Sequence, residues 1–271
     1  MIEQIDHLSY SSITTYQMCP RSWRFHYLER VQTPTSPALI FGSAFHDAIE
    51  GYLGTGKNQN PLVEFWKQSW MLQLERNAEN GINWGRDSEE SMADLGVKMF
   101  SDPDTIALVD SLKPLVLEDQ EPQVQIERRI ELQVPGVPVP IVGYIDLIEA
   151  DGVVCDFKTS ARSWDQKKAD FELQPIFYLA ALNQAGYLKT FGGLPPKLHG
   201  WPFRHYCFIK TKKPQVQIWE SYRTIGQMFW LFGLIKETWE AINAGAFPPN
   251  TTTFKCSPKY CEYWGICRGA A

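Results

Sequence analysis

Two neighbouring apolar segments joined by an Asp-Gly turn constrain the fold of this chain more than any other feature. Residues 139–150 (VPIVGYIDLIEA) and 153–160 (VVCDFKTS) are rich in β-branched and apolar side chains, which is typical of strands. The dipeptide Asp151-Gly152 between them is a strong hairpin signal. The second segment is apolar enough to lie in the middle of a sheet. The sequence therefore predicts a hairpin whose second strand is central in a sheet.

The rest of the chain predicts helices around this hairpin. Helical patterns cover residues 11–31, 41–53, 62–78, 88–112, 165–185 and 224–244, and further strands are expected over 124–134, 203–210 and 215–221. Pro20 must either kink the first helix or begin a second one. We therefore expect an α/β fold, with a mixed central sheet of about five strands flanked by helices and an N-terminal helical region. It would form a single domain over residues 1–271, with a helical insertion over 54–122 and a Cys-rich C-terminal segment over 245–271.

The composition is that of an ordinary globular protein and excludes several classes. Of the 271 residues, 44% are hydrophobic and 21% are charged, which excludes a disordered chain, a collagen and a long coiled coil. The net charge of -5 argues against a general nucleic-acid coat protein, although it permits a local basic groove and a site built from carboxylates. No apolar run approaches the roughly 20 residues of a membrane span, and the first residues lack a signal-peptide pattern. We expect a cytoplasmic protein that does not enter a membrane.

Three charged residues of the hairpin form the first candidate site. Side chains at i and i+2 of a strand share a face, so Asp156 and Lys158 project together while Phe157 turns to the other face. The Asp-Gly turn can bring Asp146 beside Asp156. Adjacent carboxylates repel each other unless a hard divalent cation neutralises them, and a lysine beside them would stabilise charge on a phosphate or orient an attacking water. The alternative is a set of solvated residues on an exposed strand, but the apolar neighbours indicate burial.

These motifs, in their order along the chain, resemble those of the PD-(D/E)XK nuclease superfamily. The pattern is GYIDLI, then CDFKTS, then Gln174 and Tyr178 in QPIFY, over a match that runs from about residue 10 to 268. Within the superfamily the chain resembles the RecB-type branch, which includes the CRISPR-associated RecB-like exonucleases and the AddB nuclease domain. In that branch a histidine on an upstream helix joins the metal site, and His46 in GSAFHDAIE matches it by context. The resemblance implies a restriction-endonuclease-like core.

The resemblance also implies the roles of individual residues. The implied ligands of magnesium or manganese are His46, Asp146, Asp156 and the backbone carbonyl of Phe157. Catalysis would depend on Lys158 together with the two aspartates, and the scissile nucleotide would contact Gln174 and Tyr178. Glu127, on the first predicted strand, lies where the family often carries an acid near the metal. Because Pro175 follows Gln174, the helix is expected to begin at Pro175, with Gln174 at or near its N-cap.

The six cysteines divide into two groups. Cys155 and Cys207 lie on predicted strands among apolar neighbours and are expected to be core residues. The other four are Cys19 and the C-terminal trio Cys256, Cys261 and Cys267, spaced C-x4-C-x5-C. In a reducing compartment such cysteines are metal ligands more often than disulfides, and zinc and an iron–sulfur cluster both remain open. An early cysteine with a C-terminal trio resembles the iron–sulfur staple of the RecB-type branch, which implies a 4Fe–4S cluster, although the family's usual first gap is two residues rather than four.

The function expected from this resemblance is a metal-dependent DNA exonuclease. Its substrate would be DNA, with single-stranded ends favoured, and basic residues near the Asp156–Lys158 strand would contact phosphates. The chain has no phosphate loop of its own, so a helicase or a recombination or CRISPR adaptation partner fits a role in recombination, repair, phage DNA processing or CRISPR adaptation. The alternatives are a non-catalytic DNA-end-binding protein that keeps the nuclease fold and a zinc-stapled interaction module.

Overall fold

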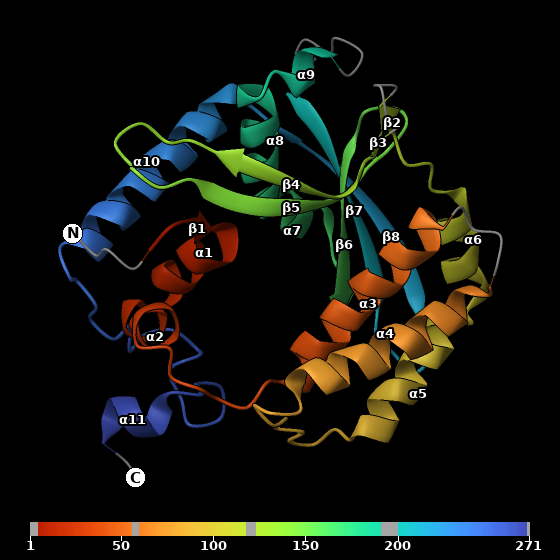
Figure 1. The fold of residues 1–271 in the computed structure, drawn as a ribbon, viewed down its shortest axis with the longest axis horizontal. Coiled ribbons are helices and arrows are strands. Elements are labelled where there is room, and N and C mark those ends of the chain that lie inside the picture. The colour runs from red at the N-terminus through yellow and green to blue at the C-terminus, as the bar shows by residue number, and fades with distance from the viewer. Residues whose placement is uncertain (1–4, 56–59, 118–122, 191–199, 270–271) are drawn as a thin grey trace. The chain divides into compact units, whose positions relative to one another are not determined.

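The sheet of this protein is mixed and lies between helices (Figure 1). The structure, a computed structural model, describes residues 5–55, 60–117, 123–190 and 200–269, so the segments expected over 54–122 and 245–271 lie partly outside it. Among the described residues, a six-stranded sheet has the order β1-β5-β6-β7-β8, with β4 also paired to β5, and β2 and β3 form a separate two-stranded sheet. The strands are β1 (Leu8–Ser9), β2 (Val116–Leu117), β3 (Gln123–Val124), β4 (Ile126–Leu132), β5 (Ile141–Ile148), β6 (Val154–Ser160), β7 (Trp201–Ile209) and β8 (Gln215–Arg223).

Strand directions confirm the expected α/β fold with a mixed sheet. The β5–β6 and β7–β8 pairs are antiparallel, whereas β1–β5 and β6–β7 are parallel. The strand β6 is central, as its apolar sequence predicts, because it pairs with β5 on one side and β7 on the other. The two-residue strand β1 was not expected, since so short a segment carries no alternation.

Backbone contacts divide the chain into two compact units. Unit 1 comprises Met1–Thr33, Ile130–Gly143 and Ile225–Ala271, and unit 2 comprises Pro34–Arg129 and Tyr144–Thr224. The strands β4 and β5 each contribute residues to both units.

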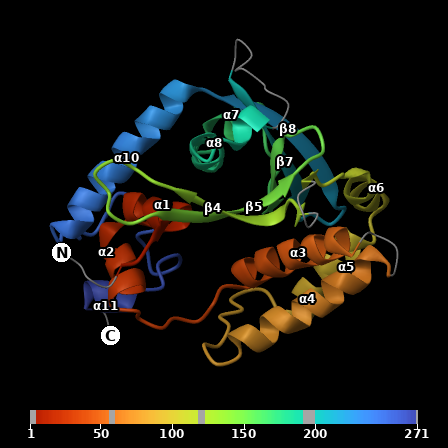
Figure 2. The same ribbon diagram turned by 45° about the horizontal axis from the view of Figure 1, so that its top comes forward.

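Unit 2 is built in layers on β6, β7 and β8. Figure 2 shows α3 (Pro37–Gly54), α4 (Leu62–Asn77) and α5 (Glu89–Phe100) together on one side of these strands, with α7 (Gln166–Phe171) and α8 (Gln174–Gln184) on the other. The helix α6 (Pro103–Ser111) joins the first group, and α9 (Tyr187–Thr190) follows α8. The larger core packs Phe157 of β6 and Phe208 of β7 against these helices, notably against Phe45 of α3. A smaller cluster contains Trp164, Ala169, Cys207 and Ile209.

Unit 1 contains β1, the early helices and the C-terminal helices. The helices are α1 (Tyr10–Met18), α2 (Pro20–Trp23), the π-helical turn η1 (Arg24–Leu28), α10 (Ile225–Asn243) and α11 (Trp264–Arg268). The helix expected over 11–31 is interrupted at Cys19, whose backbone is extended, and Pro20 begins the second helix. The hydroxyl of Tyr16 donates to the carbonyl of Ala246 over 2.5 Å, which ties α1 to the segment after α10.

Proline and cap chemistry also divide two other expected helices. The helix expected over 88–112 becomes α5 and α6, because Asp102 caps a new helix and accepts from the amides of Asp104 and Thr105. The helix expected over 165–185 becomes α7 and α8, which begins at Gln174 with Pro175 as its second residue. No helix in the described part of the chain has both the length and the apolar composition that a bilayer crossing requires.

A glycine in α5 allows the close approach of α4. A Cβ atom added at Gly96 would lie 1.9 Å from Cε2 of Trp66, a residue of α4 that is 1% exposed. Gly96→Ala should therefore lower the free energy of unfolding by about 1–3 kcal/mol or more through overpacking. Gly42→Ala in α3 is the control, because no atom lies within 4 Å of the added Cβ and alanine should stabilise that helix by up to about 1 kcal/mol. Urea unfolding of both variants measures the difference, and equal stability would contradict this packing.

Candidate metal centre

The hairpin between β5 and β6 brings the predicted acidic residues onto neighbouring strands. Leu147 pairs with Cys155 and Ile148 with Val154. The turn is tight, because the amide of Gly152 donates to the carbonyl of Glu149 over 2.7 Å and Gly152 has a φ of 81°, which glycine adopts without strain. This register carries Asp146 of β5 toward Asp156 of β6.

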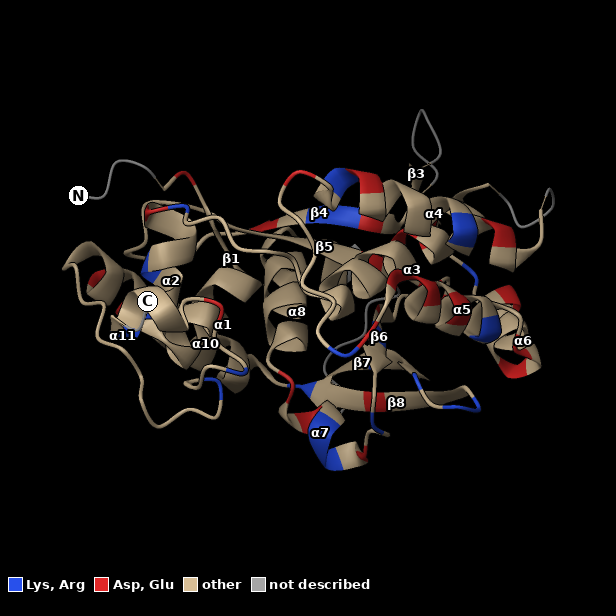
Figure 3. Ribbon diagram, turned by 90° about the horizontal axis from the view of Figure 1, so that it is seen from below, with Lys and Arg blue, Asp and Glu red and all other residues tan. Residues whose placement is uncertain are grey.

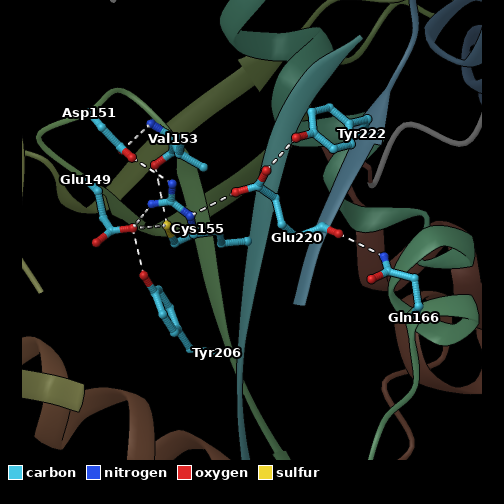
Figure 4. A network of polar contacts seen from close by, with 9 residues as sticks. Glu149, Asp151, Val153, Cys155, Gln166, Tyr206, Glu220 and Tyr222 are labelled. Atoms are coloured by element: carbon cyan, nitrogen blue, oxygen red, sulfur yellow. Dashed lines mark hydrogen bonds and ion pairs between the residues drawn. The ribbon is translucent and has the colours of Figure 1, made fainter. Parts of the chain in front are cut away.

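A polar network holds the hairpin to the rest of the sheet (Figure 4). The guanidinium of Arg204, on β7, contacts Glu149 over 2.5 Å, Asp151 over 2.7 Å and Glu220 of β8 over 3.3 Å. The hydroxyl of Tyr206 and the thiol of Cys155 also donate to Glu149, over 2.7 and 3.2 Å. Glu149 and Asp151 belong to the segment that joins β5 to β6, so Arg204 fixes the turn from which the strands that carry Asp146 and Asp156 diverge.

The first group of candidate ligands is His46, Glu127 and Asp146. One ligand atom from each lies within 4.8 Å of the others, and this is the only such group of three among the described residues. Nδ1 of His46, on α3, lies 3.4 Å from Oδ2 of Asp146, and the amide of Phe157 donates to the same oxygen over 2.6 Å. The structure therefore brings together two ligands that the resemblance implies and adds Glu127.

Glu127 occupies an unusual backbone conformation. Its φ is 45°, and Arg30 is the only other described residue besides glycines with a positive φ. The expected strand over 124–134 is broken just before it, at the buried Gln125, so that β3 and β4 are separate. Residues held in this region cluster at functional sites, because the surrounding structure must offset their strain. Alternation along a regular strand could not have placed this carboxylate.

The second group links Asp156, Lys158, Gln174 and Tyr178 in a chain of contacts. The ammonium of Lys158 lies 2.7 Å from Oδ2 of Asp156 and donates to Oε1 of Gln174 over 2.6 Å. The amide nitrogen of Gln174 then donates to the hydroxyl of Tyr178 over 2.6 Å. Gln174 is the first residue of α8, so a glutamine at the helix start still reaches the lysine. Asp156 is thus paired with Lys158 and lies outside the group of three ligands.

Burial and charge shift the pKa values of these residues in opposite directions. Asp146 is 6% and Asp156 1% exposed. Burial raises the pKa of Asp156 to about 6, although Lys158 opposes the shift. Burial also acts on Asp146, but His46 outweighs it and lowers the pKa of that carboxyl. In return, Asp146 overcomes the effect of burial on His46 and raises its pKa to about 9. Burial and the Asp146 and Glu50 charges raise the pKa of Glu127 to about 7.

The donor set fits a hard divalent cation. Carboxylate oxygens are the ligands that magnesium and manganese prefer, and an imidazole nitrogen is an acceptable addition. The raised pKa of Glu127 reflects burial and the neighbouring charges of Asp146 and Glu50, and a bound cation would relieve this repulsion. His46, Glu127 and Asp146 would hold the metal, with Asp156 beside them on β6.

Three basic side chains of unit 2 pack on aromatic rings. Arg128 lies over Tyr187 at 3.8 Å, Lys168 over Trp164 at 4.4 Å and Lys210 over Phe41 at 4.8 Å. Figure 3 shows basic positions on α7 and at β4, and acidic positions on α3. Cations held in this way keep their charge in place, so they remain candidates for phosphate contacts.

Four cysteines gather in unit 1, apart from two in the core. Cys155 and Cys207 are both 0% exposed, as the sequence predicts. Burial raises the pKa of Cys261, and the neighbouring thiols of Cys19, Cys267 and Cys256 raise it further. Cys19 also accepts from the amide of Asn250, which lies in the C-terminal segment, over 3.4 Å. The structure therefore brings the early cysteine to the late trio.

The comparisons with known proteins identify the superfamily and support the fold. The family model of the PD-(D/E)XK nuclease superfamily matches residues 7–268. The chain belongs to this superfamily. Among solved structures, it is similar to the crystal structure of a "Putative exonuclease" from Eubacterium rectale, with a TM-score of 0.60 and 13% identity over 98% of this chain and 88% of the other. This likeness shows the fold alone. The comparison with curated proteins gives no match.

Metal binding to this superfamily member should weaken at low pH. A raised carboxyl pKa means that Glu127 keeps its proton up to about pH 7, and His46 up to about pH 9, so the metal must displace protons. We expect manganese to bind at least roughly tenfold more weakly at about pH 6 than at about pH 8. Isothermal titration of the metal measures this. Glu127→Gln should reduce the pH dependence, whereas Glu131→Gln on the same strand should keep it. A pH-independent affinity would contradict the assignment of ligands.

Proposed function

We propose that this nuclease-superfamily protein is a metal-dependent DNA exonuclease that acts on single-stranded ends. The observation that carries the proposal is the adjacency of the three-ligand group to the Asp156–Lys158 pair. The name of the structural neighbour supports an exonuclease, and the resemblance to RecB-type enzymes supports action on DNA ends. The described site retains every side chain that the resemblance implies, which favours catalysis over a non-catalytic end-binding protein.

The metal would be held by His46, Glu127 and Asp146, with Asp156 nearby. When bound, magnesium or manganese would supply charge neutralisation and Lewis-acid chemistry at the scissile phosphate. The protein's own contribution is to hold these acids in a buried site, where electrostatic interactions are stronger than in water. The Arg204 network contributes by fixing the hairpin that positions two of the acids.

Lys158 would stabilise the charge that develops on the phosphate. Burial acts to lower the pKa of Lys158, but Asp156 and Asp146 outweigh it and raise it, so the ammonium stays charged at neutral pH. An ammonium has three donors, and Asp156 and Gln174 account for two contacts. The lysine can therefore also donate to a phosphate oxygen. Donors fixed in advance of the reaction lower the barrier because they need little reorganisation.

Gln174 and Tyr178 would orient the lysine and the nucleotide. The amide of Gln174 bridges Lys158 and the Tyr178 hydroxyl, so hydrogen bonds hold the three side chains in a fixed relative orientation. Burial raises the pKa of Tyr178 well above its ordinary value, so its hydroxyl keeps its proton and remains a donor. No base-reading motif accompanies the site, which fits cleavage with little sequence preference. A helicase or a recombination or CRISPR adaptation partner would supply single-stranded ends.

The four gathered cysteines would bind a 4Fe–4S cluster with a structural role. The resemblance to the iron–sulfur staple supports this occupant, and zinc bound by the same four thiolates is the alternative. Such a cluster would close a loop from Cys19 to Cys256 and so stabilise unit 1 by removing chain entropy from the unfolded state.

Substitution of Lys158 tests its role in DNA cleavage. Lys158→Ala should reduce the rate of DNA cleavage by roughly 100- to 1,000-fold, since it removes a donor to the transition state, while the variant stays folded. EDTA should stop the wild-type reaction. Lys67→Ala, at an exposed lysine paired with Glu64, is the control and should cleave normally. Cleavage of end-labelled single- and double-stranded DNA with manganese measures all three. Wild-type rates in EDTA or in Lys158→Ala would reject the mechanism.

Iron analysis of six variants tests the cluster. Serine at Cys19, Cys256, Cys261 or Cys267 should remove the brown colour and the bound iron and destabilise the fold. Cys155→Ser and Cys207→Ser should keep the iron and cost at most about 1–3 kcal/mol of stability for a buried hydroxyl. Iron and sulfide per chain, after anaerobic purification, is the measurement. Iron retained without Cys19 would show that the ligands were chosen wrongly, and zinc in its place would identify the alternative occupant.

A further inference from the structure

A pocket in unit 1 takes no part in the reaction proposed for unit 2. It has a volume of about 230 Å³. Its lining comes from residues 5–9 and Ser12, which lead into and begin α1, and from residues of the helical turns after Cys19. This volume lies below the roughly 300–1,000 Å³ of sites for drug-sized ligands. The pocket therefore has room for one ring system rather than a larger molecule.

Two aromatic rings line the pocket. The rings of Trp23 and Tyr27 lie 5.3 Å apart at 31°. Tyr27 is half-buried and is also contacted edge-on by His26, whose ring centroid lies 4.6 Å away and whose Nδ1 is 3.1 Å from the hydroxyl of Tyr263. These contacts fix the orientation of Tyr27, so a planar ligand could stack on it without first ordering the ring.

Trp23, which lines the pocket, has a buried indole nitrogen without a hydrogen-bond partner in the described part of the chain. Trp23 is 1% exposed, and its Nε1 has no partner among the described residues. Buried indole N–H groups normally find an acceptor. Because this nitrogen is itself buried, Trp23 supports Tyr27 through ring contact and donates no hydrogen bond into the pocket.

Arg30 supplies a positive charge where the pocket meets solvent. The residue is exposed, lines the pocket and makes no ion pair with another described residue. Asp6, the one acid among the described lining residues, pairs with His7 over 2.7 Å, so no described acid of the pocket lining pairs with Arg30. Arg30 also has a φ of 51°, a conformation that an arginine adopts only under strain. Because strained residues cluster at functional sites, the position of the Arg30 side chain at this pocket points to a function for it.

We propose that this pocket binds one nucleobase of the DNA strand, stacked on Tyr27, with an adjoining phosphate on Arg30. The inference rests on the proposed function for the choice of DNA as ligand. Stacking tolerates any base because every base has a π face, which agrees with an enzyme that lacks base-reading motifs. The base would give the strand a point of attachment in addition to the scissile nucleotide.

Binding of a fluorescein-labelled oligothymidylate to the full chain tests the proposal. The titration, followed by anisotropy, is carried out in EDTA so that the strand stays intact. Tyr27→Ala should weaken binding by roughly 5- to 100-fold, whereas Tyr27→Phe should bind like the wild type because it keeps the stacking face. Tyr260→Ala, at an exposed tyrosine outside the pocket, is the matched control and should not change the affinity.

Arg30→Gly separates recognition from structure. Glycine adopts a positive φ without strain, so this variant should be at least as stable as the wild type by thermal unfolding. It should nevertheless bind the oligonucleotide more weakly, with the slope of log affinity against log salt reduced by about one. Arg30→Lys should retain most of the binding. Arg86→Ala, at an exposed arginine between α4 and α5, is the control and should leave affinity and slope unchanged.

Photocrosslinking locates the base directly. An oligothymidylate with one 5-iodouracil should form an adduct on the tryptic peptide of residues 25–30, FHYLER. An adduct only on other peptides, or wild-type affinity in both Tyr27→Ala and Arg30→Gly, would overturn the proposal. Cleavage with manganese is measured in parallel. A protein that binds through the pocket without cutting DNA would refute the proposed function alone, and one that cuts normally with unaltered variant affinities would refute the pocket alone.

Discussion

Two carboxylates buried side by side are the constraint on which the site of this protein depends. Asp146 and Asp156 lie on adjacent strands and are almost inaccessible to solvent. Charges removed from water require partners, and each acid has a different one. His46 and the amide of Phe157 compensate Asp146, whereas Lys158 compensates Asp156. His46 belongs to α3, whereas Phe157 and Lys158 belong to β6. The charge of Asp146 therefore requires that the face of α3 that carries His46 lies toward the hairpin.

The two faces of β6 serve different purposes. Cys155 and Phe157 join the larger core beneath α3 to α6, and Asp156 and Lys158 point the other way toward α8. Side chains alternate between the two faces of β6, so the same strand contributes to the core of unit 2 and to the candidate site. Arg204 on β7 adds to this connection, because it holds the turn through Glu149 and Asp151, neither of which belongs to the candidate ligand group.

The sequence predicts what depends on periodicity and misses what depends on irregular backbone. The pairing of Asp156 with Lys158 follows from alternation, and the turn at Asp151-Gly152 follows from its dipeptide. Alternation does not predict where the carboxylate of Glu127 lies, because its positive φ interrupts the regular strand. The ion pairs of Arg204 join residues 53 and 55 positions apart in sequence, a separation at which local patterns carry no information.

The residue ranges that make up unit 1 affect the order in which the two units can fold during synthesis. Unit 2 uses only residues 34–129 and 144–224, whereas unit 1 also needs 225–271. A ribosome makes the chain in order, and compact regions fold as their residues emerge. The nuclease centre can thus assemble on a nascent chain whose Cys19 still lacks its three later neighbours. During that interval Cys19 also lacks Asn250, whose amide donates to its sulfur in the folded chain, so the surroundings of this thiol are completed last.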